Sequence, residues 1–112
     1  MSSSSEVVQR FFDAVIARDV ESVPENFSND AVFTMDGVGV VGTGRDEIKR
    51  VYAAMFEEHP EVHVEIVQRL AIGRVVVDLE SVAGFDTAEA ADWIWVYTVD
   101  GGLITTMHGI PS

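Results

Sequence analysis

The 112-residue sequence contains no cysteine, which excludes a disulfide framework, a thiolate nucleophile and a zinc site with cysteine ligands. Basic residues are also scarce, because seven lysines and arginines face nineteen aspartates and glutamates, for a formal net charge of −12 at pH 7. Such a charge repels phosphate backbones and anionic lipids, so we expect neither nucleic acid nor a membrane surface as a partner. No apolar run approaches the ~20 residues that span a bilayer, and the polar stretch Met1 to Ser5 does not resemble a signal peptide. The composition therefore predicts a soluble, cytoplasmic protein.

The sequence is nevertheless rich enough in apolar residues to form a core. These residues make up 47% of the chain and charged residues 23%, which is typical of a globular domain and not of a disordered acidic tail. The length corresponds to one domain. We expect residues 1–5 to form a disordered tail and residues 6–112 to form the domain.

The first half of the chain predicts three helices. In residues 6–18, apolar side chains recur at helical spacing: Val8, Phe11, Phe12, Val15 and Ile16. A capping box from Ser22 to Glu25, with Pro24 in the first turn, predicts a short second helix. A second capping box, of Thr43 with Asp46, begins a third helix that ends at His59, before Pro60. Its apolar face comprises Ile48, Val51, Tyr52, Met55 and Phe56.

Strands are predicted mainly in the second half. Two short strands, Ala31 to Met35 and Val38 to Val41, follow a turn at Ser28–Asp30 and flank an Asp36-Gly37 hairpin turn. After Pro60 the apolar period changes to two, which predicts four long strands: 62–72, 75–85, 88–99 and 103–110. In the first of these we expect Val64, Leu70 and Ile72 on one face and His63, Glu65 and Arg69 on the other. This separation of helices from strands predicts an α+β fold, with helices covering one face of a bent sheet.

Four segments of this pattern resemble a known superfamily. They are the end of the first helix at Ala17-Arg18-Asp19, the stretch Asn29-Asp30-Ala31-Val32-Phe33, Gly44 opening the helix with Tyr52, and the turn Asp100-Gly101-Gly102-Leu103-Ile104. Over residues 6–110 the chain resembles nuclear transport factor 2, ketosteroid isomerase and the SnoaL-like polyketide cyclases. The resemblance implies a cone-shaped, cystatin-like fold, in which a curved antiparallel sheet wraps around three N-terminal helices and encloses an apolar pocket. Members of this superfamily often form dimers through the outer face of the sheet, so the resemblance also implies such a dimer.

The resemblance leaves one catalytic position of the superfamily occupied. The segment Asp36-Gly37-Val38-Gly39 is similar to the one that carries the general-base aspartate of ketosteroid isomerases. The oxyanion-hole donors of those enzymes correspond to Phe11 and Trp95, which cannot replace them. The acid and histidine of SnoaL-type cyclases, near Trp95 and Ser81, are absent, as is the Asp-Arg-Asp set of limonene-epoxide hydrolases. Asp36 remains as a candidate general base, with a structural turn aspartate as the alternative.

The polyether epoxide-opening cyclases of the superfamily pair that aspartate with a second acid early in the first long strand. Glu61 or Glu65 could take this place, with His63 as a further candidate.

Aromatic and apolar side chains from helices and strands could converge on one pocket. We predict these ligand-binding residues: Phe11, Val15, Tyr52, Met55, Phe56, Trp93, Trp95, Tyr97 and His108. Tryptophan and tyrosine add polar groups to such a wall, which suits an aromatic or polyketide-like ligand. The same rings could instead fill the core or form an oligomer contact.

No metal or cofactor is predicted. His59 and His63 have the spacing of two ligands on a helix, but Pro60 ends the helix between them. Gly37-x-Gly39-x-x-Gly42 matches a dinucleotide-binding motif, but it lacks the βαβ unit that such a site requires.

The sequence thus predicts a small-molecule-binding domain. We expect it to be an isomerase or an epoxide-opening cyclase or hydrolase, acting on an apolar polyketide- or steroid-like substrate with Asp36 as general base. The alternative is a non-catalytic ligand-binding or dimerisation module with a vestigial pocket. We also predict a homodimer through the outward sheet face bearing His63 and Glu65.

Overall fold

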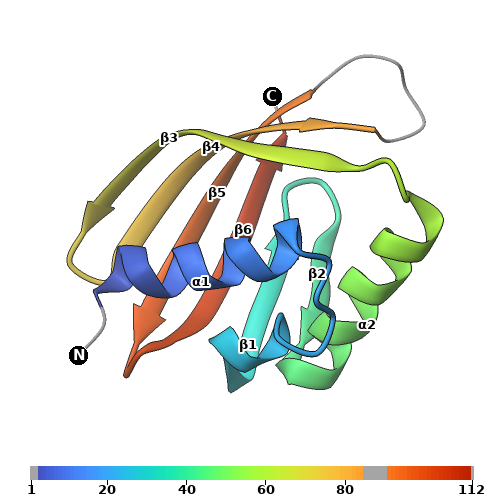
Figure 1. The fold of residues 1–112 in the computed structure, drawn as a ribbon. Helices are drawn as coiled ribbons and strands as arrows, with labels where there is room; N and C mark the ends of the chain where they lie inside the picture. Colours follow the sequence, from blue (N-terminus) through green and yellow to red (C-terminus); the bar gives the residue numbers. More distant parts are fainter. Residues whose placement is uncertain (1–2, 85–90, 112) are drawn as a thin grey trace.

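Two helices and a six-stranded sheet make up the computed structural model, which describes residues 3–84 and 91–111 (Figure 1). The helices are α1 (Ser4–Ile16) and α2 (Gly44–Glu58). The strands are β1 (Phe27–Met35), β2 (Gly39–Thr43), β3 (His63–Ile72), β4 (Val75–Ala83), β5 (Ala91–Asp100) and β6 (Leu103–Pro111). The predicted α+β fold with a curved sheet is confirmed. The predicted strand ends at Phe85 and Ala88 lie outside the described residues.

The strands lie in the order β2-β1-β6-β5-β4-β3. Neighbouring strands are antiparallel except for β1 and β6, which run parallel, so the sheet is mixed and not antiparallel throughout. Helix α1 crosses the concave face of β3 to β6, and α2 packs against β1 and β2 (Figure 1). The core lies between the helices and this concave face. Among the described residues, no helix has both the length and the apolar character needed to cross a membrane.

Helix α1 begins earlier than the sequence pattern predicted. The Ser3 hydroxyl accepts a hydrogen bond from the Glu6 N–H at 3.2 Å, and the Glu6 carboxylate accepts one from the Ser3 N–H at 3.1 Å. This capping box satisfies two backbone donors at the helix start. Ser3 to Ser5 therefore form the cap and the first turn, whereas the prediction placed them in a disordered tail.

The two predicted capping boxes do not form. The Ser22 hydroxyl donates to the Asp19 carboxylate at 2.7 Å, and the predicted second helix is a single 3-10 turn, Pro24–Asn26. At the start of α2, the Thr43 N–H donates to the Glu47 carboxylate at 2.8 Å, which replaces the expected pairing with Asp46. The end of α2 before His59 agrees with the prediction.

The predicted turn at Ser28–Asp30 is part of strand β1, which starts at Phe27. The hairpin between β1 and β2 does turn at residues 36–38.

A bulge in β3 reverses the two faces of this strand. Ile66 pairs with Glu80 but Gln68 pairs with Leu79, so Val67 is an extra residue in the ladder. Beyond a bulge the alternation of side chains is inverted. Arg69 therefore faces inward, whereas Leu70 and Ile72 are 60% and 84% exposed on the outer face, opposite to the prediction.

Candidate functional site

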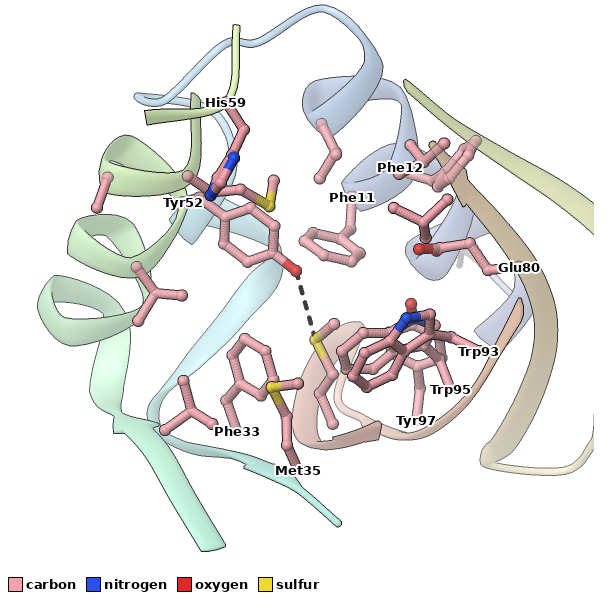
Figure 2. A pocket seen from close by; sticks show the side chains of 18 of the residues that line it. Phe11, Phe12, Phe33, Met35, Tyr52, His59, Glu80, Trp93, Trp95 and Tyr97 are labelled. Carbon is pink, nitrogen blue, oxygen red and sulfur yellow. Dashed lines mark hydrogen bonds between the residues drawn. The ribbon is translucent and has the colours of Figure 1, made fainter. Parts of the chain in front are cut away.

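A cavity of about 400 Å³ lies between the two helices and the concave face of the sheet (Figure 2). Its wall is mainly apolar and contains seven aromatic rings, those of Phe11, Phe12, Phe33, Tyr52, Trp93, Trp95 and Tyr97. The helices contribute their apolar stripes, and β5 contributes alternate side chains, as the period of a strand requires. The size and lining are those of a small-molecule site.

The ring of Trp95 depends on a glycine in the neighbouring strand. Trp95 pairs with Gly109 across β5 and β6, and a Cβ atom at Gly109 would lie 2.6 Å from ring atom Cη2 of Trp95. The missing side chain lets the indole lie flat over β6, where it stacks on Trp93 with ring centroids 5.5 Å apart. The edge of this stack closes one side of the cavity (Figure 2).

Glu80 is the carboxylate of the cavity wall nearest the tryptophans (Figure 2). Its position on the inner face of β4 leaves it 8% exposed. This burial raises the pKa of Glu80 to about 7; the neighbouring Trp95 indole opposes the rise, and the charge of Asp78 adds to it. Near neutral pH the group can therefore both give up and accept a proton.

Three hydrogen-bond donors belong to residues that line the cavity, two on β5 and one on α2. The indole N–H of Trp95 and the hydroxyl of Tyr97 are buried without a hydrogen-bond partner of good geometry in the described part of the chain. The Tyr52 hydroxyl reaches only the sulfur of Met107, at 4.0 Å, which is a weak contact (Figure 2). Burial raises the pKa of both tyrosines well above the ordinary value, so they remain protonated donors.

A second buried carboxylate, Asp78, has a different environment. The Arg69 guanidinium donates to it twice, at 2.6 and 2.8 Å, and also to the side-chain oxygen of Gln9 at 2.6 Å. The pair links β3, β4 and α1, and the side chain of Asp78 is fully buried. Asp78 is thus held in an ion pair, and Arg69 is not available to Glu80.

Most of the predicted ligand-binding residues line the cavity: Phe11, Val15, Tyr52, Met55, Trp93, Trp95 and Tyr97. Phe56 is not part of the lining, because its ring packs between Tyr52, at 6.1 Å, and the Arg18 guanidinium, at 5.5 Å. His108 is not part of it either, because it alternates with the inward-facing Met107 and Gly109 and so points to the outer face.

Asp36 lies outside the cavity as well. It occupies the β1–β2 turn with its side chain 65% exposed, and its carboxylate is 3.8 Å from Nε2 of His108. The other ring nitrogen of His108 is 2.6 Å from the Thr34 hydroxyl. The structure thus brings Asp36 and His108 together on the outer side of the sheet and not in the cavity.

Sequence reasoning missed Glu80, although a signal for it existed. Within the predicted strand, Val76, Asp78, Glu80 and Val82 follow one another at every second position. Strand geometry alone therefore places both acids on the face of the buried valines. For metals, no group of three His, Asp or Glu side chains in ranges 3–84 and 91–111 could hold an ion.

The sequence matches the model of the SnoaL-like domain over residues 8–107. A search of curated protein sequences gave no significant match. Among solved structures, an uncharacterised protein of the cystatin fold from Novosphingobium aromaticivorans is 25% identical, with a TM-score of 0.89 and coverage of 98% of this chain and 99% of that one.

Two further structures show the same fold. A candidate polyketide cyclase from Sinorhizobium meliloti is 21% identical, with a TM-score of 0.83 and coverage of 96% and 99%. A hypothetical protein with a ketosteroid isomerase-like fold from Catenulispora acidiphila, solved in complex with trimethylamine, is 20% identical, with a TM-score of 0.84 and coverage of 96% and 85%. The α+β fold with its curved sheet and the match across residues 8–107 agree, and the chain belongs to the SnoaL-like domain family.

Proposed function

We propose that the chain binds an apolar small molecule in the cavity and that Glu80 moves a proton to or from it. The observation that carries this proposal is a buried carboxyl group facing a cavity of about 400 Å³ whose wall is otherwise almost entirely apolar. Proton transfer of this kind fits the reaction classes inferred from the sequence, namely isomerisation or epoxide opening of a polyketide- or steroid-like compound. The names of the neighbouring structures, polyketide cyclase and ketosteroid isomerase-like, support the same classes.

The chemistry would use Glu80 in the role that the sequence suggested for Asp36. A carboxyl group with a pKa of about 7 is matched to proton transfer near neutral pH. The Tyr52 hydroxyl, which points into the cavity (Figure 2), could donate to an oxygen of the substrate as negative charge develops on it, which is often the largest contribution to such catalysis. Neither step needs a metal or a cofactor.

The alternative is binding without catalysis. It is favoured by the ion pair between Asp78 and Arg69, because among the described residues this pair leaves Glu80 as the one carboxyl group beside the tryptophans, with no second acid to share the chemistry. The amine complex of the Catenulispora acidiphila protein is consistent with a ligand site in that relative.

A thermal-shift screen of apolar compounds with two variants tests the proposal, because a bound ligand stabilises the folded state whatever reaction follows. For any compound that is turned over, Glu80→Gln should abolish turnover while binding persists, and Asp36→Asn should retain both. Turnover by Glu80→Gln at the wild-type rate would contradict the catalytic role. Loss of activity in Asp36→Asn alone would return the role to Asp36.

We also propose that two copies of the chain associate through the convex face of the sheet. This face bears His63 and Glu65, as the sequence suggested, and it also exposes apolar side chains: Val67, Leu70, Ile72, Val75 and Ile94. Exposed apolar groups gathered on one sheet face favour a protein contact. A dimeric mass at micromolar concentration that becomes monomeric in Leu70→Glu is expected, and a monomeric wild type would contradict the dimer.

The cytoplasmic location is likewise proposed from composition.

A further inference from the structure

The ionisable side chains on the cavity wall are mainly acidic. Glu80 and Glu58 supply two carboxyl groups, and no lysine or arginine is among the described residues that line the cavity. Within ranges 3–84 and 91–111, His59 is the one lining side chain that could become positive. The other described residues of the wall carry apolar or aromatic side chains.

We infer that the ligand carries a cationic ammonium group on an apolar body, and that Glu80 binds this group. The inference rests on the proposed function only in that the ligand occupies the same cavity. The inference states that the ligand is positively charged, a property that the proposed proton transfer does not specify.

The rings are arranged on both sides of the space that Glu80 faces. Tyr52 and Phe33 stack with centroids 6.2 Å apart on the side of α2, and Trp93 and Trp95 stack on the side of β5 (Figure 2). An ammonium group is attracted to the negative face of an aromatic ring and not to its positive edge. Because these rings stack on one another, much of their faces is covered, and Glu80 supplies the main attraction. A neutral group of the same shape gains only the contact energy.

The carboxyl group gives a second reason. An ionised carboxylate in an apolar site is unfavourable unless a positive charge accompanies it. Arg69 on the neighbouring strand cannot serve, because Asp78 and Gln9 hold its guanidinium. A cationic ligand would supply the missing charge, and the overall charge of −12 would raise its local concentration.

Other titratable groups around Glu80 do not change this balance. Asp78 is paired with Arg69, and Tyr52 and Tyr97 remain neutral because burial raises the pKa of each. Helix α1 contributes only Phe11, Phe12 and Val15 to the wall. Glu58 and His59, at the end of α2, are the remaining ionisable lining residues.

The protein contains a built-in reporter for the test. Its two tryptophans, Trp93 and Trp95, both line the cavity, so intrinsic fluorescence reports on this site. We would titrate the full chain with phenyltrimethylammonium and with its neutral isostere, tert-butylbenzene. The cation should bind about tenfold tighter, which corresponds to about 1.4 kcal/mol. Its affinity should rise from pH 6 to pH 8 as Glu80 ionises, whereas that of the neutral compound should stay constant.

Two variants assign the effect. In Glu80→Gln the preference for the cation should fall several-fold while tert-butylbenzene still binds, and in Asp36→Asn the preference should be unchanged. Equal affinity of the wild type for both compounds would overturn the inference but leave the apolar site of the proposed function intact. Failure of both compounds to bind would contradict both. A full cation preference in Glu80→Gln would overturn the role of Glu80.

Discussion

Asp78 and Glu80 lie two residues apart on the same face of β4, and both are buried, yet their surroundings differ. The Asp78 carboxylate receives two hydrogen bonds from Arg69, and Gln9 ties this pair to α1. The Glu80 carboxyl group faces a cavity lined with aromatic rings. Burial alone therefore does not identify a functional acid. The two carboxyl groups are distinguished by whether a positively charged side chain is hydrogen-bonded to them.

The difference divides the concave face into two regions. At the Asp78 end, α1 is joined to the sheet by polar groups that satisfy one another, as a structural role requires. At the Glu80 end, a carboxyl group and the Tyr52 hydroxyl face a cavity whose wall is otherwise mainly apolar (Figure 2). Four measurements on the folded chain would test whether the two regions differ in this way.

Removal of the arginine should have the largest effect on stability. Arg69→Met leaves Asp78 buried without its cation and should lower the free energy of unfolding by about 3–5 kcal/mol in a denaturant titration. The double variant Arg69→Met/Asp78→Leu should recover much of this loss, because an apolar pair needs no compensation. A loss below about 1 kcal/mol in the single variant would show that the pair is not structural.

The pH dependence of stability should distinguish Glu80, whose pKa is raised, from the ion-paired Asp78. The pKa of Glu80 rises from an ordinary value of 4.5 to about 7 on folding, so between these values the folded state binds more protons than the unfolded state. Stability contributed by this group is therefore present at low pH and is lost as the pH rises to 7, by roughly 3 kcal/mol. Denaturation of the wild type and Glu80→Gln at pH 5 and pH 8 should show the variant gaining relative stability at pH 8. A difference independent of pH would contradict this environment.

A methyl group at Gly109 should disturb the ligand region without touching the ion pair. Because the added Cβ would meet the Trp95 ring, Gly109→Ala should displace the indole into the cavity and cost about 1–3 kcal/mol. Tryptophan fluorescence and binding of an apolar probe should change together. Gly42→Ala is a matched control, since a Cβ there lies 3.5 Å from its neighbours. Equal behaviour of the two variants would show that Gly109 does not set the position of Trp95.

The smallest effect is expected on the outer side of the sheet. Asp36 and His108 are 3.8 Å apart and partly exposed, and exposed ion pairs contribute little. Asp36→Asn should change stability by no more than about 0.5 kcal/mol and should leave probe binding unaltered, as measured by thermal denaturation with and without probe. A shift in probe affinity would connect this cluster to the cavity after all.

The sequence was sufficient for the elements that follow simple periods. The helical stripe containing Phe11 and Val15 and the alternation of Trp93, Trp95 and Tyr97 correctly placed these side chains on the cavity wall. The bulge at Val67 could not be predicted, because it depends on the pairing of β3 with β4 and reverses Arg69 relative to Leu70. The placement of Asp36 and His108 outside the cavity likewise depends on the register of β6.

Glu80 was predictable from the sequence only in part. Its side was predictable from the period of β4, but its surroundings depend on Trp95 and Asp78, which strand pairing and tertiary packing bring beside it.

The most direct test of the account is a carboxyl-carbon NMR titration of the glutamates in the wild type, with Glu80→Gln used to assign the signal. We expect the resonance lost in the variant to titrate near pH 7, because burial raises the pKa of Glu80 to about 7. A Glu80 resonance that titrates near the ordinary value of 4.5 would contradict the claim that this carboxyl group occupies an apolar, functional cavity.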